Sequence, residues 1–423
     1  MVMNLQARDK KVIWHPTTQH GLGMSFPAVR RAQGAWLELE DGTKLLDAVS
    51  SWWVNIHGHA HPVIVDAMAA QTKQFEQILF GNFTHEPAVN LAERLIAAVN
   101  GGGADMSRCF YSDNGSTAVE VALKMAFQYY KNHGEKTRTR FIALEGGYHG
   151  DTLGAMSVTE RGYLHQHFVE LFTEVDYVKV GDIASLESLL SKTPAQYAAL
   201  IVEPLIQGAS GMRTYSKDFL QEAAALCKKS GTMLIVDEIF TGFYRTGTCF
   251  AFSQAGIQPD FICLAKGITG GFLPLSVTLS TEAVYNAFLS SNVADAFLHG
   301  HSYTANAVAC AAGVASWDLL QQATTQQAIQ KIVAKTKQWI DYFAKHPKVK
   351  DARCLGTIGA IEIRDFPGYF SGYSRQITEQ AMKHGVFLRP LGAVIYALPP
   401  YCVTEEEMDL IYQTMEKILN DIK

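Results

Sequence analysis

Two side chains that could share one reaction stand at the ends of two apolar runs. Residues 233–236 are followed by Asp237 and Glu238, and residues 261–265 are followed by Lys266. Short apolar runs bounded by turn residues are typical of buried parallel strands. Because ligands of open α/β sheets bind beyond the carboxyl ends of the strands, an acid and an amine at two such ends can face one crevice.

This pairing has the chemistry that pyridoxal 5'-phosphate requires. A lysine amine can form a Schiff base with the aldehyde of that cofactor, and a carboxylate can keep its pyridine nitrogen protonated. The alternative is structural, with Asp237 as a helix N-cap and Lys266 as a solvated surface charge. The two residues alone leave both interpretations open, because short motifs carry a real false-positive risk.

Two polar turns could complete such a site. Gly115 and Ser116 lie between a strand-like run that ends at Ser112 and a strong helical pattern. Free backbone N–H groups at the start of a helix can hold a phosphate, although the same residues could merely cap the helix. The turn that contains Ser302 also leads into a helical pattern, so it is a second candidate for a phosphate contact.

An aromatic residue and two arginines stand in positions suited to ligand binding. Tyr148 follows a predicted strand, where its ring could lie against a flat cofactor or pack on the sheet. Arg245 lies between glycines and could hold an anion or form a surface salt bridge. Arg389, which is close in sequence to Tyr396, could bind a substrate carboxylate in a bidentate manner.

Three histidines at alternate positions, His57, His59 and His61, suggest a metal site. No acid or thiol completes a ligand set, so we predict a histidine-bearing loop and no bound metal. The preceding pair, Trp52 and Trp53, could belong to the core or form the wall of a pocket.

The composition is that of an ordinary globular protein. The chain has 423 residues, of which 48% are hydrophobic and 18% charged, enough for a large core and two structural domains. The net charge of -5 argues against a nucleic-acid partner. We see no secretory signal pattern and no apolar run that could span a bilayer. The seven cysteines are scattered, which fits reduced thiols in a cytoplasmic protein.

Predicted strands alternate with predicted helices from about residue 107 to 280. This order predicts an α/β fold with a doubly wound, mostly parallel sheet. Residues 36–47 predict a hairpin around the Asp41-Gly42 turn, and residues 62–99 have helical spacing. The region after about residue 349 reads as a separate α+β unit.

Over nearly its whole length, the chain resembles the class III aminotransferases, which are pyridoxal phosphate enzymes of fold type I. The pattern that carries this resemblance is Asp237-Glu238-x-x-x-Gly242-x-x-Arg245-Thr246-Gly247, followed by Lys266. Other stretches resemble the members of the class that act in biotin biosynthesis: Ile13-Trp14-His15-Pro16, Ser50-Ser51-Trp52-Trp53, Gly147-Tyr148-His149-Gly150-Asp151-Thr152, Glu203-Pro204-x-x-Gln207-Gly208-Ala209 and Arg389-Pro390-x-Gly392.

The resemblance implies two domains. Residues 62–315 would form a large cofactor-binding domain with a mostly parallel, seven-stranded sheet. Residues 1–61 and 316–423 would together form a smaller α+β domain built from both ends of the chain.

The resemblance also implies roles for the cofactor-binding residues. Lys266 would carry the cofactor and shuttle a proton, Asp237 would pair with the pyridinium, and Tyr148 would stack on the ring. Gly115 and Ser116 would bind the phosphate. In a homodimer with shared active sites, Ser302 of one subunit would reach the phosphate held by the other.

On the substrate side, the resemblance implies a ping-pong transfer of an amino group to 8-amino-7-oxononanoate, with S-adenosylmethionine as donor. Arg389 would hold the substrate carboxylate and Trp52 would line the aliphatic path. Gly300, Arg245 and Tyr396 would flank the substrate.

Three residues depart from the family pattern. Thr17 stands where relatives carry Tyr, Tyr244 replaces a Gly, and His301 replaces a Pro. These changes leave the donor open between S-adenosylmethionine and lysine. Another class III transaminase acting on an ω-amino acid, or an inactive relative that serves as a binding protein, are further alternatives.

Overall fold

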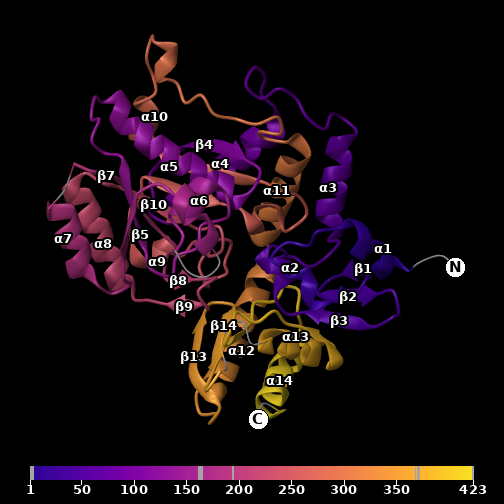
Figure 1. The fold of residues 1–423 in the computed structure, drawn as a ribbon. Helices are drawn as coiled ribbons and strands as arrows, with labels where there is room; N and C mark the ends of the chain where they lie inside the picture. The colour runs from indigo at the N-terminus through magenta and orange to yellow at the C-terminus, as the bar shows by residue number, and fades with distance from the viewer. Residues whose placement is uncertain (1–3, 161–164, 193–194, 367, 369–371, 422–423) are drawn as a thin grey trace.

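A seven-stranded sheet forms the centre of the computed structural model, which describes residues 4–160, 165–192, 195–366, 368 and 372–421 (Figure 1). The strands lie in the order β4-β12-β11-β10-β7-β5-β6. Their bounds are β4 (Met106–Ser112), β5 (Arg140–Leu144), β6 (Val175–Val178), β7 (Tyr197–Val202), β10 (Met233–Asp237), β11 (Phe261–Leu264) and β12 (Ser276–Thr281). Neighbouring strands from β11 to β6 pair in parallel, whereas β12 is antiparallel to β11 and β4. The predicted mostly parallel sheet is confirmed.

The strands of this sheet are apolar because helices cover both of its faces. Along β10, Ile235 packs in a cluster with α5 (Gly115–Asn132), whereas Leu234 and Val236 pack in the cluster on the opposite face. Burial on both sides removes the alternation of apolar and polar residues that a half-exposed strand would show. The remaining helices of this region are α6 (Leu153–Ser157), α7 (Ile183–Lys192), α8 (Lys217–Ser230), α9 (Phe252–Ala255) and α10 (Glu282–Asn286).

The N-terminal region carries a small sheet followed by helices. Its elements are α1 (Leu5–Val12), β1 (Val29–Gln33), β2 (Trp36–Leu39), β3 (Lys44–Asp47), α2 (Ser50–Trp53), α3 (Pro62–Thr72) and α4 (Glu86–Gly101). The predicted hairpin is confirmed as the antiparallel pair β2–β3. The helical spacing over 62–99 corresponds to two helices, α3 and α4, with a break over residues 73–85.

Both ends of the chain meet in one sheet. The C-terminal elements are α11 (Ala307–Leu320), α12 (Ala323–Phe343), β13 (Val349–Leu355), β14 (Ile358–Ile363), α13 (Tyr373–Lys383), β15 (Val386–Phe387), β16 (Val394–Ala397) and α14 (Glu405–Asp421). Strand β15 pairs in parallel with β3, so the indigo and yellow segments lie side by side below the large sheet (Figure 1). The predicted domain boundary after residue 315 falls inside α11, and the division into two domains stays a prediction.

Short elements complete the chain. They are the 3-10 turns η1 (His20–Leu22), η2 (Gln166–Leu171), η3 (Lys266–Thr269) and η4 (Val293–Asp295), and the strand pair β8 (Ile206–Gln207) and β9 (Arg213–Thr214). Within the described residues, every helix is too short or too polar to cross a lipid bilayer.

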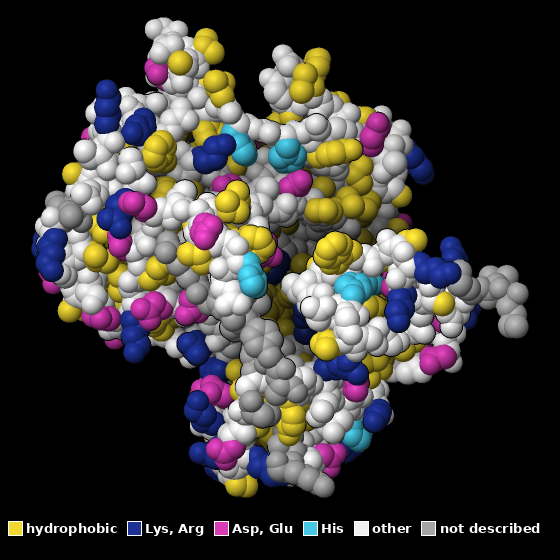
Figure 2. Space-filling model, in the orientation of Figure 1, with side chains coloured by type: hydrophobic (Ala, Val, Ile, Leu, Met, Phe, Trp, Pro, Cys, Tyr) yellow, Lys and Arg dark blue, Asp and Glu magenta, His cyan; other side chains and the backbone are white. Residues whose placement is uncertain are grey.

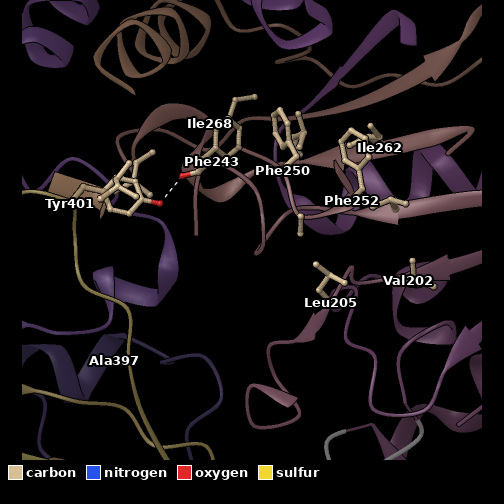
Figure 3. Close-up of a cluster of buried hydrophobic side chains, with 14 of the residues drawn as sticks. Val202, Leu205, Phe243, Phe250, Phe252, Ile262, Ile268, Ala397 and Tyr401 are labelled. Atoms are coloured by element: carbon tan, nitrogen blue, oxygen red, sulfur yellow. Dashed lines mark hydrogen bonds between the residues drawn. The ribbon is translucent and has the colours of Figure 1, made fainter. Parts of the chain in front are cut away.

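An aromatic cluster ties the C-terminal region to the loop after β10. Phe243, Phe250 and Phe252 are buried together, and the hydroxyl of Tyr401 donates a hydrogen bond to the carbonyl of Phe243 at 2.6 Å (Figure 3). Each buried aromatic side chain contributes about 1.5–3 kcal/mol by leaving water. This packing fixes the backbone that leads into Arg245.

Candidate active site

A cavity of about 400 Å³ lies at the carboxyl ends of the parallel strands. It brings together five of the residues singled out from the sequence: Gly115, Ser116, Tyr148, Asp237 and Lys266. Glu203, at the carboxyl end of β7, and Trp53 also line it. The cavity therefore brings a carboxylate, an amine and an aromatic ring together at the edge of the sheet where the parallel strands end.

Asp237, the last residue of β10, is held rigidly. The residue is 3% exposed, and its Oδ2 accepts a hydrogen bond from His149 Nδ1 at 2.7 Å. Its Oδ1 accepts from the backbone N–H of Ile239 at 3.0 Å. The residues that follow form turns, so Asp237 does not cap a helix. A buried carboxylate with two donors retains lone pairs that can accept from a ligand in the cavity.

Lys266, the second residue after β11 and the first of η3, points its amine into the same cavity. Its Nζ lies 5.3 Å from the centroid of the Trp53 ring, and it forms no hydrogen bond or ion pair with another described residue. Burial lowers the pKa of the Lys266 amine, and the carboxylates of Asp237 and Glu203 oppose that shift. Lys266 is therefore no solvated surface charge, and burial increases the neutral, nucleophilic fraction of its amine.

Glu203 holds the loop that carries Tyr148. Its Oε1 accepts from the backbone N–H of Tyr148 at 3.0 Å, and its Oε2 accepts from that of Gly208 at 3.0 Å. Burial raises the pKa of Glu203 to about 7. The Tyr148 ring lies nearly parallel to that of His165, with centroids 6.3 Å apart and an interplanar angle of 15°. Burial, and next the charge of Asp151, raises the pKa of the Tyr148 hydroxyl, which keeps the ring neutral.

The start of α5 forms the polar end of the cavity. Asn114 and Thr117 cap this helix through a reciprocal pair of hydrogen bonds, so Ser116 is not needed as a cap. The backbone N–H groups of Gly115 and Ser116 make no hydrogen bond within the described part of the chain. Such free donors at a helix N-terminus suit an anion.

Gly150 allows the backbone that leads into Asp151 to pack against Ser116 at this end of the cavity. Ser116 Oγ accepts from the backbone N–H of Asp151 at 2.8 Å. Gly150 has a φ of +125°, and a Cβ built on it would lie 1.8 Å from Ser116 Oγ. Only glycine allows the backbone to approach so closely in this conformation.

The tryptophan that lines the cavity is Trp53 rather than Trp52. Residues 50–53 have four consecutive positive φ angles, of 50°, 59°, 135° and 74°, a conformation in which bulky residues are strained. Trp53 Nε1 donates to the hydroxyl of Tyr396 at 3.1 Å, and Arg245 Nη2 donates to the carbonyl of Trp53 at 3.4 Å. Tyr396 and Arg245 therefore lie behind Trp53, and neither lines the cavity.

Arg245 is buried behind Trp53. It is 1% exposed, and its Nη1 donates to the carbonyl of Pro399 at 2.9 Å, so it is not part of a surface salt bridge. Its guanidinium carbon lies 5.1 Å from the centroid of the Tyr401 ring. Burial lowers the pKa of Arg245. The side chain joins the Trp53 segment to the C-terminal region, and its predicted place beside the substrate stays a prediction.

Arg389 and Trp52 form a second, more exposed group. The guanidinium carbon of Arg389 lies 4.0 Å from the Trp52 ring centroid, and its Nη2 donates to Thr17 Oγ1 at 3.0 Å. Gly300 and Ser302 lie in an exposed turn before α11, and neither is among the described residues that line the cavity.

Two of the three alternating histidines have separate structural partners. His59 Nε2 lies 3.0 Å from Asp47 Oδ2, and His57 Nε2 lies 3.1 Å from Ser316 Oγ. Burial lowers the pKa of His57 to about 3. Among the described residues, no group of three or more His, Cys, Asp and Glu side chains could hold a metal ion.

A family comparison now assigns the fold. The family described as aminotransferase class-III matches residues 17–419. This chain belongs to the class-III aminotransferases. Among the described residues that line the cavity, Lys266 is the only one with a side-chain amine, and it follows a strand next to the one that ends in the buried Asp237. The family assignment accounts for this arrangement.

Individual relatives of this aminotransferase cover nearly all of it. The adenosylmethionine-8-amino-7-oxononanoate aminotransferase of Synechococcus elongatus is 44% identical, with 97% of this chain and 99% of that protein covered. A crystal structure of an enzyme with the same name from Methanocaldococcus jannaschii has a TM-score of 0.92 at 32% identity, covering 98% of both chains. An amine transaminase from an uncultivated Pseudomonas species, in its PLP-bound form, has a TM-score of 0.91 at 30% identity, covering 97% of this chain and 98% of that one.

Sequence reasoning missed several residues of the aminotransferase's cavity. Glu203 and His149 both stand within the motifs that carry the family resemblance, but the sequence analysis gave neither a role. The position of Glu203 at the carboxyl end of β7 was a usable signal, since Asp237 was found by the same reasoning. Asp47 lies six residues before Trp53 and anchors the Trp segment through Ser51 and His59, and nothing in the sequence indicated this role.

Proposed function

We propose that this chain is a pyridoxal phosphate-dependent transaminase that converts 8-amino-7-oxononanoate to 7,8-diaminononanoate in biotin biosynthesis, with S-adenosylmethionine as amino donor. One observation carries the proposal. The buried amine of Lys266 and the anchored carboxylate of Asp237 line one cavity at the ends of adjacent strands. The names of the Synechococcus and Methanocaldococcus relatives support this choice of substrates.

The residues present fit pyridoxal phosphate. When bound, this cofactor supplies an electron sink for the carbanion that forms when an amino acid loses its α-proton. Lys266 would hold the aldehyde end and would carry a proton at Nζ, a task suited to an amine whose pKa burial lowers. The polar end at Gly115 and Ser116, with Gly150 giving clearance, would hold the phosphate.

Asp237 would stabilise a protonated ring nitrogen. A carboxylate fixed by His149 and by the N–H of Ile239 cannot turn away from the cavity. Tyr148 would cover one face of the ring, and Glu203 would keep the Tyr148 backbone in place. A prearranged charge of this kind costs no reorganisation during the reaction.

Substrate recognition would rest on the more exposed group. Arg389 would bind the carboxylate of 8-amino-7-oxononanoate, and Trp52 would line the path of its aliphatic chain. Arg245 and Tyr396 would act through Trp53, which they hold against the cavity.

A homodimer would complete the site. A groove of about 880 Å³ runs between α3 and α11, and hydrophobic side chains gather beside it (Figure 2). Leu79 and Phe83 in the groove wall are 66% and 64% exposed. Exposed apolar patches of this kind mark protein interfaces. Gln77 Nε2 donates to the Ser302 carbonyl at 3.2 Å, so this turn adjoins the groove, and Ser302 and Gly300 would reach the partner's cavity. A cytoplasmic location completes the proposal.

The experiment that tests the function follows the two half-reactions separately. Protein purified with cofactor should absorb in the visible, S-adenosylmethionine or lysine should bleach that band, and 8-amino-7-oxononanoate should restore it. Lys266→Ala should lose both the band and turnover, whereas Lys73→Ala, at an exposed position, should keep both. Normal turnover by Lys266→Ala would end the proposal.

A second candidate is a transaminase for another amine. The structural match to the Pseudomonas amine transaminase favours it, as does Thr17 in place of the family's Tyr. Bleaching by simple amines, without restoration by 8-amino-7-oxononanoate, would favour this candidate.

A further inference from the structure

The guanidinium of Arg389 is held between two strained residues that come from different segments. Thr17, whose Oγ1 accepts from Arg389 Nη2 at 3.0 Å, has a φ of +51°. Trp52, whose ring lies 4.0 Å from the guanidinium carbon, has a φ of +135°. Positive φ is unfavourable for β-branched and bulky residues, and such strain persists only where the surrounding structure imposes it.

A small folded loop delivers Thr17 to this position. The His15 ring stacks on Phe26 with centroids 3.8 Å apart, and its Nε2 lies 2.8 Å from Asp9 Oδ2. The backbone N–H of His15 donates to His20 Nε2 at 3.1 Å. The loop is thus closed by its own side chains on both sides of Thr17, so the hydroxyl is presented to Arg389 by a fixed support.

These contacts leave part of the guanidinium unused. No carboxylate among the described residues lies within ion-pair distance of Arg389. Trp52 covers one face, and Thr17 takes one N–H of Nη2. A guanidinium has five N–H groups in a planar fork, so two parallel donors remain for a carboxylate from a ligand.

We propose that Thr17 is a positioning residue that sets the in-plane orientation of the Arg389 guanidinium and thereby the affinity for substrates with a terminal carboxylate. Stacking on Trp52 alone fixes the plane of the guanidinium but allows it to rotate within that plane. The hydrogen bond to Thr17 removes this freedom, so the free donor edge meets the carboxylate in a bidentate geometry. The inference rests on the proposed function only in taking Arg389 as the carboxylate site.

The test compares an acid with its neutral amide. Nonanoate and nonanamide are titrated into the holoenzyme by calorimetry, with wild type, Thr17→Val, Thr17→Ser and Thr18→Val. Val keeps the shape of Thr without its hydroxyl, Ser restores the hydroxyl, and Thr18, whose Oγ1 donates to the Pro16 carbonyl at 2.9 Å, is the matched control. We expect Thr17→Val to weaken nonanoate binding by about tenfold, or about 1.4 kcal/mol, and to leave nonanamide unchanged.

Rescue separates positioning from general stability. Thr17→Ser and Thr18→Val should bind nonanoate within about twofold of wild type, well below the tenfold step. An unchanged acid-to-amide affinity ratio in Thr17→Val, or an equal loss for acid and amide, would overturn the inference. Because binding needs no turnover, failure of the proposed function would appear separately, as wild-type protein that binds nonanoate yet does not aminate 8-amino-7-oxononanoate.

Discussion

Asp47 anchors the strained turn that forms the cavity wall, and its replacement by Asn is a stringent test of that arrangement. The Asp47 side chain is fully buried, and its Oδ2 accepts from Ser51 Oγ at 3.0 Å and from His59 Nε2 at 3.0 Å. Its Oδ1 accepts from the backbone N–H of Val49 at 3.3 Å. Asn removes the charge and turns one acceptor into a donor.

The magnitude follows from those contacts. In either amide orientation, at least one N–H donor of Val49 or His59 would face the new NH₂ group. Loss of a hydrogen bond to a buried charged group costs about 1.5–3 kcal/mol, so we expect the free energy of unfolding to fall by about 2 kcal/mol. Four residues with positive φ store about 1 kcal/mol or more each, so a weakened anchor lets the turn relax. If 2 kcal/mol are lost from the arrangement that turnover needs, kcat/KM falls by about 30-fold.

The assay combines urea unfolding with steady-state kinetics at pH 7. Asp66→Asn is the matched control, because Asp66 is exposed on α3 and makes none of these contacts. We expect Asp47→Asn to lose both stability and kcat/KM, and Asp66→Asn to lose neither. An Asp47→Asn protein within about 0.5 kcal/mol of wild type, with full kcat/KM, would refute this account of the turn.

Two further predictions concern the cavity itself. Gly150→Ala should weaken cofactor binding by at least about tenfold in an equilibrium titration, because its Cβ would displace Ser116, whereas Gly103→Ala, with a φ of +100° and open space around it, should bind normally. For Glu203, burial raises the folded-state pKa from 4.5 to about 7, so the folded chain binds the extra proton and stability falls as pH rises through this interval. At about 1.4 kcal/mol per pH unit, the unfolding free energy of wild type relative to Glu203→Gln should fall by about 3 kcal/mol between pH 4.5 and 7. A pH-independent difference would contradict it.

The large sheet and the centre of the site could be predicted because both follow from short-range patterns. Apolar runs gave the strands, and the side chains just beyond Val236 and Ala265 had to lie at the same edge of a parallel sheet. The direction of β12 could not be obtained in this way, because an apolar run has no polarity and β12 runs antiparallel to β11.

Other features of the site depend on distant parts of the chain and could not be predicted from local patterns. Arg245 is buried because carbonyl groups from residues 398 and 399 surround it, and no local pattern reports such partners. The choice between Trp52 and Trp53 depends on four left-handed residues whose types disfavour that conformation. Their strain is imposed by Asp47, Arg245 and Tyr396, so only the folded structure reveals which ring faces the cavity.

Covalent trapping of the cofactor tests the central claim most directly. Borohydride reduction of the holoprotein should fix a pyridoxyl group on the lysine that holds the cofactor, and peptide mass spectrometry should locate it. The account predicts a single modified site, Lys266, with no label on Lys266→Ala. A pyridoxyl group on another lysine, or none on wild-type protein saturated with cofactor, would contradict it.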